Sequence, residues 1–221
     1  MNRSVILLSG GLDSTTTLFY AQRRGFKTAA LIFNYGQRHK KEVERAKAIA
    51  HYAGCDYHVV KIALPWKGSA LLDQHVAIPE NRNVDVRGIP PTYVPARNVI
   101  FLSFAVSYAE AIGAARVFIG ANAIDYSGYP DCRPEFFVAF EDVLSKGLKS
   151  GVEGNPIKIE APFLKKTKAQ IIKAGLKLKV PYHLTWSCYK GGARPCGVCD
   201  SCILRQRGFA ALKVRDPLLS I

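Results

Sequence analysis

Short apolar runs alternate along the chain with longer stretches whose apolar residues recur at helical spacing. The apolar runs predict five strands, at residues 5–8, 28–34, 57–62, 116–119 and 157–161. The periodic stretches predict five helices, at residues 12–24, 42–54, 98–112, 134–147 and 168–175. Repeated alternation of strand and helix is typical of a parallel sheet with helices on both faces. The pattern therefore predicts a doubly wound α/β fold with a mainly parallel, five-stranded sheet.

The chain has 221 residues, which suits one α/β domain with a small addition. No internal repeat or linker divides it. We expect residues 1–180 to form the α/β domain and the cysteine-rich residues 181–221 to form a subdomain packed on the same unit. Residues 65–91 carry proline and glycine at intervals and predict a long irregular loop.

Basic residues outnumber acidic ones, with 31 Lys and Arg against 17 Asp and Glu, for a net charge of +14. This excess would attract nucleotides, carboxylates or RNA, but a lysine-rich solvated surface explains it equally well. No apolar run approaches the roughly 18 residues that span a bilayer. The apolar N-terminal segment is too short for a signal peptide. We therefore expect a cytoplasmic protein that does not enter membranes.

Four of the six cysteines, Cys188, Cys196, Cys199 and Cys202, lie within fifteen residues. Without a secretion signal, a metal site is a better interpretation than a disulfide framework. Four thiolates are the number that a tetrahedral Zn²⁺ requires, and an iron–sulfur cluster is the alternative. Because four cysteines leave no position for water, we expect a structural zinc site.

A glycine-rich string, L-S-G-G-L-D-S-T-T-T-L, joins the first predicted strand to the first predicted helix. Adjacent glycines let backbone N–H groups approach a ligand, and a helix start offers unpaired donors to phosphate. Asp13 suggests Mg²⁺ bound to those phosphates. A tight turn before a well-capped helix is the alternative, but the complete string in this place favours nucleotide binding. The predicted ATP-binding residues are Leu8, Ser9, Gly10, Gly11, Leu12, Asp13, Ser14, Thr15, Thr16, Thr17 and Leu18.

Three other segments carry candidate binding residues. Residues 34–39, N-Y-G-Q-R-H, follow the second strand and are equally well explained as a loop with a helix start. In residues 93–98, Arg97 precedes a helix and either binds phosphate or supports the fold. Residues 122–136 combine aromatic, acidic and basic side chains, which can stack on a planar heterocycle and hold its polar edges. Lys168 begins a late helix and is able to reach phosphates, although solvent exposure is the usual fate of a lysine.

The string S-G-G-x-D-S resembles the PP-loop signature of ATP pyrophosphatases. Together with N-Y-G-Q-R-H, V-P-A-R-N, D-Y-S-G-Y-P-D-C-R-P-E-F, T-W-S-C-Y and C-G-x-C-D-S-C, it resembles the 7-cyano-7-deazaguanine synthase family over nearly the whole chain. The resemblance implies an adenine nucleotide alpha hydrolase-like fold and a homodimer. It also implies one structural Zn²⁺ per chain, with Mg²⁺ accompanying ATP.

The activity that this resemblance implies is a carbon–nitrogen ligase reaction of queuosine biosynthesis. ATP and ammonia would convert 7-carboxy-7-deazaguanine into 7-cyano-7-deazaguanine through an activated carboxylate, an amide and an activated amide, without nucleic acid. We expect Asp13, Arg97 and Lys168 to be catalytic. The residues expected in the substrate pocket are Tyr35, Gln37, Asn122, Asp125, Tyr126, Tyr129, Asp131 and Arg133. The chain length leaves no room for a glutamine-hydrolysing domain, so free ammonia is the expected donor, with ammonia from a separate glutaminase as the alternative.

Two other functions compete with this one. A PP-loop tRNA-modifying enzyme, such as a sulfur transferase, would suit the basic charge but needs a reactive cysteine, and Cys132 would have to serve. A zinc-containing RNA-binding module without catalysis would leave the glycine-rich string without a role.

Overall fold

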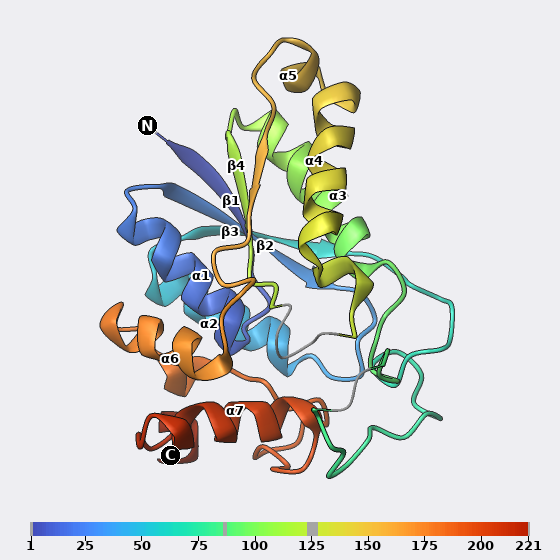
Figure 1. The fold of residues 1–221 in the computed structure, drawn as a ribbon, viewed down its shortest axis with the longest axis vertical. Coiled ribbons are helices and arrows are strands. Elements are labelled where there is room, and N and C mark those ends of the chain that lie inside the picture. The colour runs from blue at the N-terminus through green and yellow to red at the C-terminus, as the bar shows by residue number, and fades with distance from the viewer. Residues whose placement is uncertain (1, 86–87, 123–127, 221) are drawn as a thin grey trace.

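The computed structural model describes residues 2–85, 88–122 and 128–220 (Figure 1). Five strands form one sheet: β1 (Arg3–Leu7), β2 (Lys27–Asn34), β3 (Asp56–Lys61), β4 (Arg116–Ile119) and β5 (Lys158–Glu160). Their order is β3-β2-β1-β4-β5, and every neighbouring pair is parallel. The predicted doubly wound, five-stranded fold is confirmed. The strand order reverses between β1 and β4, and ligands bind α/β sheets at such a point.

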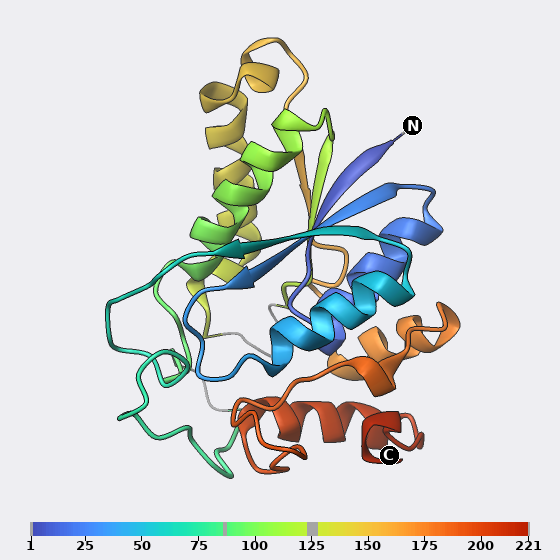
Figure 2. The same ribbon diagram turned by 180° about the vertical axis from the view of Figure 1, so that it is seen from behind.

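Helices cover both faces of the sheet (Figures 1 and 2). Helices α1 (Leu12–Arg23) and α2 (Lys41–Tyr52) lie on one face, and α3 (Arg97–Ala111) and α4 (Pro134–Gly147) lie on the other. Alternate strand residues explain the two layers: Ile6 of β1 packs in the cluster with α1 and α2, while Val5 and Leu7 pack in the cluster with α3 and α4. Burial on both faces accounts for the continuous apolar runs in the sequence.

The C-terminal part of the chain packs beside α1. Helix α6 (Lys168–Lys177) contacts α1, and α7 (Asp200–Ala211) contacts α6. Within the described part of the chain, four short helices complete the fold: η1 (Pro130–Cys132), α5 (Lys149–Val152), η2 (Tyr182–Leu184) and η3 (Pro217–Ser220). Helix α7 was not predicted, because cysteine, arginine and apolar residues share its faces and no single apolar stripe marks it. The division after residue 180 stays a prediction.

Residues 62–96 join β3 to α3, and they include the loop predicted at 65–91. Apart from one bridge between Glu80 and Cys199, the described residues of that loop contain no helix or strand. Hydrogen bonds and an ion pair nevertheless hold this loop in place. The guanidinium of Arg38 donates hydrogen bonds to three of its carbonyls, and Arg82 forms an ion pair with Asp200 at 2.7 Å. The loop is therefore held against the cysteine-rich segment.

Among the described residues, no helix combines the length and the apolar character that crossing a membrane requires.

Candidate active site

A cavity lies at the carboxyl ends of β1, β2 and β4, where the strand order reverses. Its walls come from the glycine-rich loop after β1, the segment after β2, the start of α3, the segment after β4, the first residue of α6 and the C-terminal part of the chain. The site thus draws on nearly every part of the sequence.

The glycine-rich loop presents the start of helix α1 to this cavity. Gly11 is the N-cap of α1 in an extended conformation, and no described side chain caps the helix. The hydroxyls of Ser9 and Ser14 lie 2.9 Å apart, and the Ser14 hydroxyl also accepts a hydrogen bond from the Ser9 N–H. The N–H groups of the first turn therefore point out with two hydroxyls beside them, an arrangement suited to an anion.

Two glycines allow other elements to approach this loop closely. Gly10 has φ +79, and a Cβ there would lie 2.5 Å from the carbonyl oxygen of Glu42 and 2.7 Å from the amide nitrogen of Ala46. A Cβ on Gly120, just after β4, would lie 2.7 Å from the amide nitrogen of Ser14. Only glycine lets α2 and the end of β4 pack against the loop at these distances.

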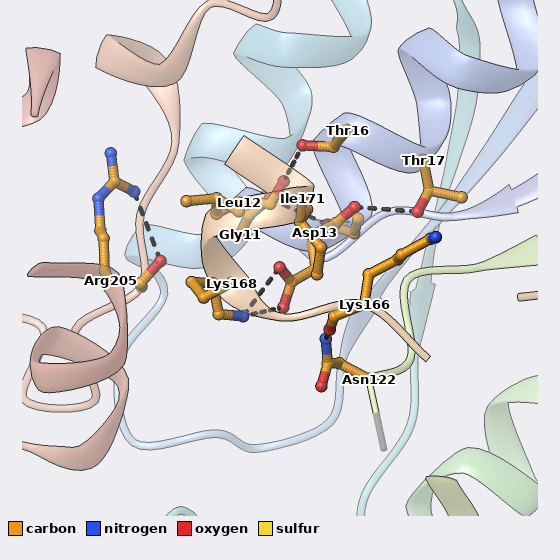
Figure 3. Close-up of polar contacts among 12 residues, drawn as sticks. Gly11, Leu12, Asp13, Thr16, Thr17, Asn122, Lys166, Lys168, Ile171 and Arg205 are labelled. Carbon is orange, nitrogen blue, oxygen red and sulfur yellow. Dashed lines mark hydrogen bonds and ion pairs between the residues drawn. The ribbon is translucent and has the colours of Figure 1, made fainter. Parts of the chain in front are cut away.

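Asp13 and Lys168 meet at the mouth of the loop. Figure 3 shows their side chains pointing toward each other from α1 and α6. The Lys168 ammonium lies 2.7 and 2.9 Å from the two carboxylate oxygens of Asp13. Thr167 and Gln170 form a capping box that fixes the start of α6 and hence the position of Lys168. A cation and a carboxylate are thereby held beside the start of α1.

Several residues of the predicted ATP loop support α1 instead of lining the cavity. The hydroxyls of Thr15, Thr16 and Thr17 donate hydrogen bonds to the carbonyls four residues earlier, at 2.7 to 2.9 Å. Leu18 is fully buried in the core. The loop residues that do line the cavity are Leu8, Ser9, Gly11, Leu12, Asp13 and Ser14.

Arg97 lies in the opposite wall of the cavity. Burial opposes its charge, but the facing Tyr35 and Tyr129 raise the pKa of Arg97, so it stays cationic. Asp131 adds negative charge nearby and accepts a hydrogen bond from the N–H of Asn98 at 3.0 Å. This carboxylate therefore fixes the start of α3, which carries Arg97.

The other residues predicted for the substrate pocket are divided between the cavity and its surroundings. Tyr35, Gln37, Asn122 and Tyr129 line the cavity. Asn122 also donates a hydrogen bond to the carbonyl of Lys166 (Figure 3), and the Tyr129 hydroxyl lies 2.9 Å from that of Thr92. Asp131 is buried behind Arg97, and Arg133 is exposed at the start of α4. Asp125 and Tyr126 lie outside the described residues.

Sequence reasoning missed several side chains in the cavity wall. They include Phe33, Glu42, Asn98, Phe101, Trp186, Tyr189 and Arg205. The rings of Phe33 and Phe101 are stacked, with centroids 4.0 Å apart. The backbone N–H of Trp186 donates to the carbonyl of Gly10 at 2.9 Å, which joins the C-terminal part of the chain to the glycine-rich loop. Glu42 resembled an ordinary polar residue of an amphipathic helix, so no sequence signal distinguished it.

The four clustered cysteines converge on one point. Their Sγ atoms all lie within 4.8 Å of one another. A tetrahedral zinc site with Zn–S bonds of about 2.3 Å needs sulfur atoms ~3.8 Å apart, so this donor set fits such an ion. Trp186 is hydrogen-bonded to the carbonyl of Cys188, and the Lys41 ammonium lies 3.7 Å from the centre of the Trp186 ring. The cluster is a metal site consistent with zinc, and it adjoins the cavity wall.

A phosphate-binding turn at the reversal point of a parallel sheet, with a lysine and a carboxylate beside it, defines an ATP-using enzyme of the PP-loop class. An NMN synthetase from Francisella tularensis shares the fold, with a TM-score of 0.50 and 16% identity over 98% of this chain and 76% of that one. A family model described as queuosine biosynthesis protein QueC matches residues 3–213. The chain belongs to this family.

Two relatives are similar over almost their full length. A protein of a Cyanothece species is 55% identical, covering 97% of each chain. A protein of Picrophilus torridus is 54% identical, covering 95% of this chain and 87% of that relative. Both relatives are named 7-cyano-7-deazaguanine synthase.

Proposed function

We propose that this protein uses ATP to convert 7-carboxy-7-deazaguanine and ammonia into 7-cyano-7-deazaguanine in queuosine biosynthesis. The observation that carries the proposal is a single cavity with an anion-binding turn on one side and a cationic, aromatic wall on the other. Membership of the QueC family supports it. A nucleotide and a planar acid can therefore meet in one enclosed place.

The first step activates the carboxylate, which is a poor electrophile with a poor leaving group. A carboxylate oxygen attacks the α-phosphorus of ATP, pyrophosphate leaves, and an acyl adenylate forms. The free N–H groups at the start of α1 and the hydroxyls of Ser9 and Ser14 hold the phosphates. Lys168 neutralises the charge that develops there, once the phosphates compete with Asp13 for it.

Mg²⁺ fits the same place, because Asp13 offers hard carboxylate oxygens beside the turn that would hold the phosphates. When bound with ATP, the ion reduces the charge repulsion that a nucleophile meets at phosphorus. Asp13 would hold it while Lys168 moves to the phosphates.

The opposite wall orients the deazapurine. Tyr35 and Tyr129 offer aromatic faces, and Arg97 offers a fixed cation for the carboxylate of the substrate. Ammonia then displaces the adenylate oxygen and gives the amide. A second ATP activates the amide oxygen, and its departure leaves the nitrile.

Further parts of the proposal concern metal, assembly and location. The four cysteines would hold one structural Zn²⁺ and so fix Trp186 at the cavity. We also propose a homodimer, which the family resemblance implies. We place the enzyme in the cytoplasm, where thiols stay reduced, and assign nucleic acid no part in the reaction.

A sulfur transferase is the weaker candidate because of Cys132. This thiol is buried, and burial raises its pKa to about 12. It is therefore protonated at neutral pH and is a poor nucleophile.

The test is a reaction of the purified protein with ATP, Mg²⁺, ammonium and 7-carboxy-7-deazaguanine, followed by mass spectrometry. We expect nitrile only when ATP and ammonium are both present. Accumulation of the amide would limit the activity to one activation. An untouched deazapurine would refute the proposal.

A further inference from the structure

A second, smaller cavity adjoins the first on the side of α2. Tyr35, Gln37, Glu42, Arg97 and Tyr189 line both cavities, so they surround the place where the two meet. The small cavity leads toward the segment after β2 and the residue-71 end of the β3–α3 loop. The small cavity is too narrow for a nucleotide or a deazapurine. It suits a nucleophile with a single heavy atom, such as ammonia.

Glu42 supplies a negative charge at this junction. The carboxylates in the described lining of the two cavities are those of Asp13 and Glu42. Asp13 is held by Lys168 at 2.7 Å. Within residues 2–85, 88–122 and 128–220, the Glu42 side chain has neither a hydrogen bond nor an ion pair within 4 Å, although it is half-buried. It therefore keeps its lone pairs for a ligand.

The two arginines near Glu42 also interact with other groups, so the Glu42 carboxylate stays available for a ligand. Arg97, on α3, faces it but also lies near the Asp131 carboxylate. The Arg38 guanidinium is occupied by the carbonyls of the β3–α3 loop.

Burial outweighs Arg97 and raises the pKa of Glu42 to about 7, well above that of a solvated carboxyl. Such a carboxylate is more basic than usual and accepts a proton at neutral pH.

We infer that Glu42 binds ammonium where the two cavities meet and takes one proton from it, delivering ammonia to the activated substrate. The inference rests on the proposed function. One N–H bond of ammonium breaks and an O–H bond forms on Glu42. The nitrogen lone pair then forms a bond to the acyl carbon, the bond from that carbon to the adenylate oxygen breaks, and AMP leaves. The second proton of the adduct goes to solvent.

Replacement of Glu42 by glutamine tests this role. The Glu42→Gln variant keeps the shape of the side chain and loses its charge, so the KM for ammonium should rise at least about tenfold, the loss expected for one charge-assisted hydrogen bond. The KM for ATP should not change. Glu44→Gln, on the exposed side of the same helix, is the matched control and should behave like the unchanged protein.

Two further reactions separate this role from a structural one. Hydroxylamine is largely uncharged at neutral pH and needs no proton acceptor, so Glu42→Gln should use it nearly as well as the unchanged protein does. Conversion of the amide to the nitrile consumes no ammonia and should also be spared. Equal losses with hydroxylamine, or in the amide reaction, would show that Glu42 acts only by positioning Arg97 and would overturn the inference.

A binding measurement separates failure of this inference from failure of the proposed function. Thallium(I) is a monovalent cation similar in size to ammonium and is detected by its anomalous scattering. In crystals soaked with a thallium(I) salt, we expect an anomalous peak touching the Glu42 carboxylate, absent in Glu42→Gln. A junction without thallium in the unchanged protein would refute ammonium binding, whichever substrate the enzyme uses.

Discussion

Replacing Gly10 by alanine should destabilise the protein strongly and weaken ATP binding. Two costs add. The left-handed conformation at φ +79 costs a non-glycine residue about 1–2 kcal/mol. The new Cβ would also lie 2.5 Å from one backbone atom of α2 and 2.7 Å from another, and relieving such overpacking costs about 1–3 kcal/mol. The sum is roughly 2–5 kcal/mol.

Gly25 provides the matched control. It has φ +81 but nothing within 4 Å of its Cβ position, so Gly25→Ala should lose only the conformational part. For a chain of this size, about 2–4 °C of Tm is lost per kcal/mol, which gives roughly 4–20 °C for Gly10→Ala and 2–8 °C for Gly25→Ala.

Thermal melting followed by circular dichroism measures both variants, and ATP titration measures the effect on the site. ATP binding should weaken only in Gly10→Ala, because α2 must move away from the loop. Equal melting temperatures for the two variants would show that α2 does not pack on Gly10 as described.

Three other predictions follow from the site. Lys168→Met should lower kcat/KM for ATP by at least about a hundredfold, since a buried cation beside the phosphates is lost; a loss below threefold in steady-state assays would contradict this role. Cys132→Ser should keep full nitrile formation, because the thiol is protonated; an inactive but folded variant would favour sulfur transfer. Removing zinc with a chelator, or replacing Cys199 by serine, should lower Tm and also weaken ATP binding, since Trp186 is hydrogen-bonded to Cys188 and to the loop at Gly10. Loss of metal, measured by emission spectrometry, without either effect would disprove the link.

Local patterns predicted the features that depend on neighbouring residues. The strand Arg116–Ile119 was predicted with its bounds, because an apolar run followed by glycine is a local signal. The helix Pro134–Gly147 was also predicted with its bounds, because a proline in the first turn is another local signal. The cysteine cluster was equally visible, since its ligands are close in sequence.

Features that depend on long-range packing, or on which of two possible partners a side chain takes, could not be predicted. A run of three threonines after a glycine pair suggests hydroxyls for phosphate, and only the structure shows them turned back to helix carbonyls. Glu42 and Arg205 come to the cavity from helices whose sequences carry no signal of this cavity. Helix α7 lacks an apolar stripe because its buried side includes polar residues, among them Ser201 and Arg205, which is paired with Asp216.

The hydrogen bond between Trp186 and Gly10 has a consequence for the protein during its synthesis. The glycine-rich loop is synthesised well before the segment that closes the cavity beside it, because the two segments lie far apart along the chain. A nascent chain with α1 and most of the sheet already formed still lacks the wall supplied by Trp186, Tyr189 and Arg205. We therefore expect a nascent chain to bind ATP weakly until the segment that carries these three residues has been added and has packed against the loop.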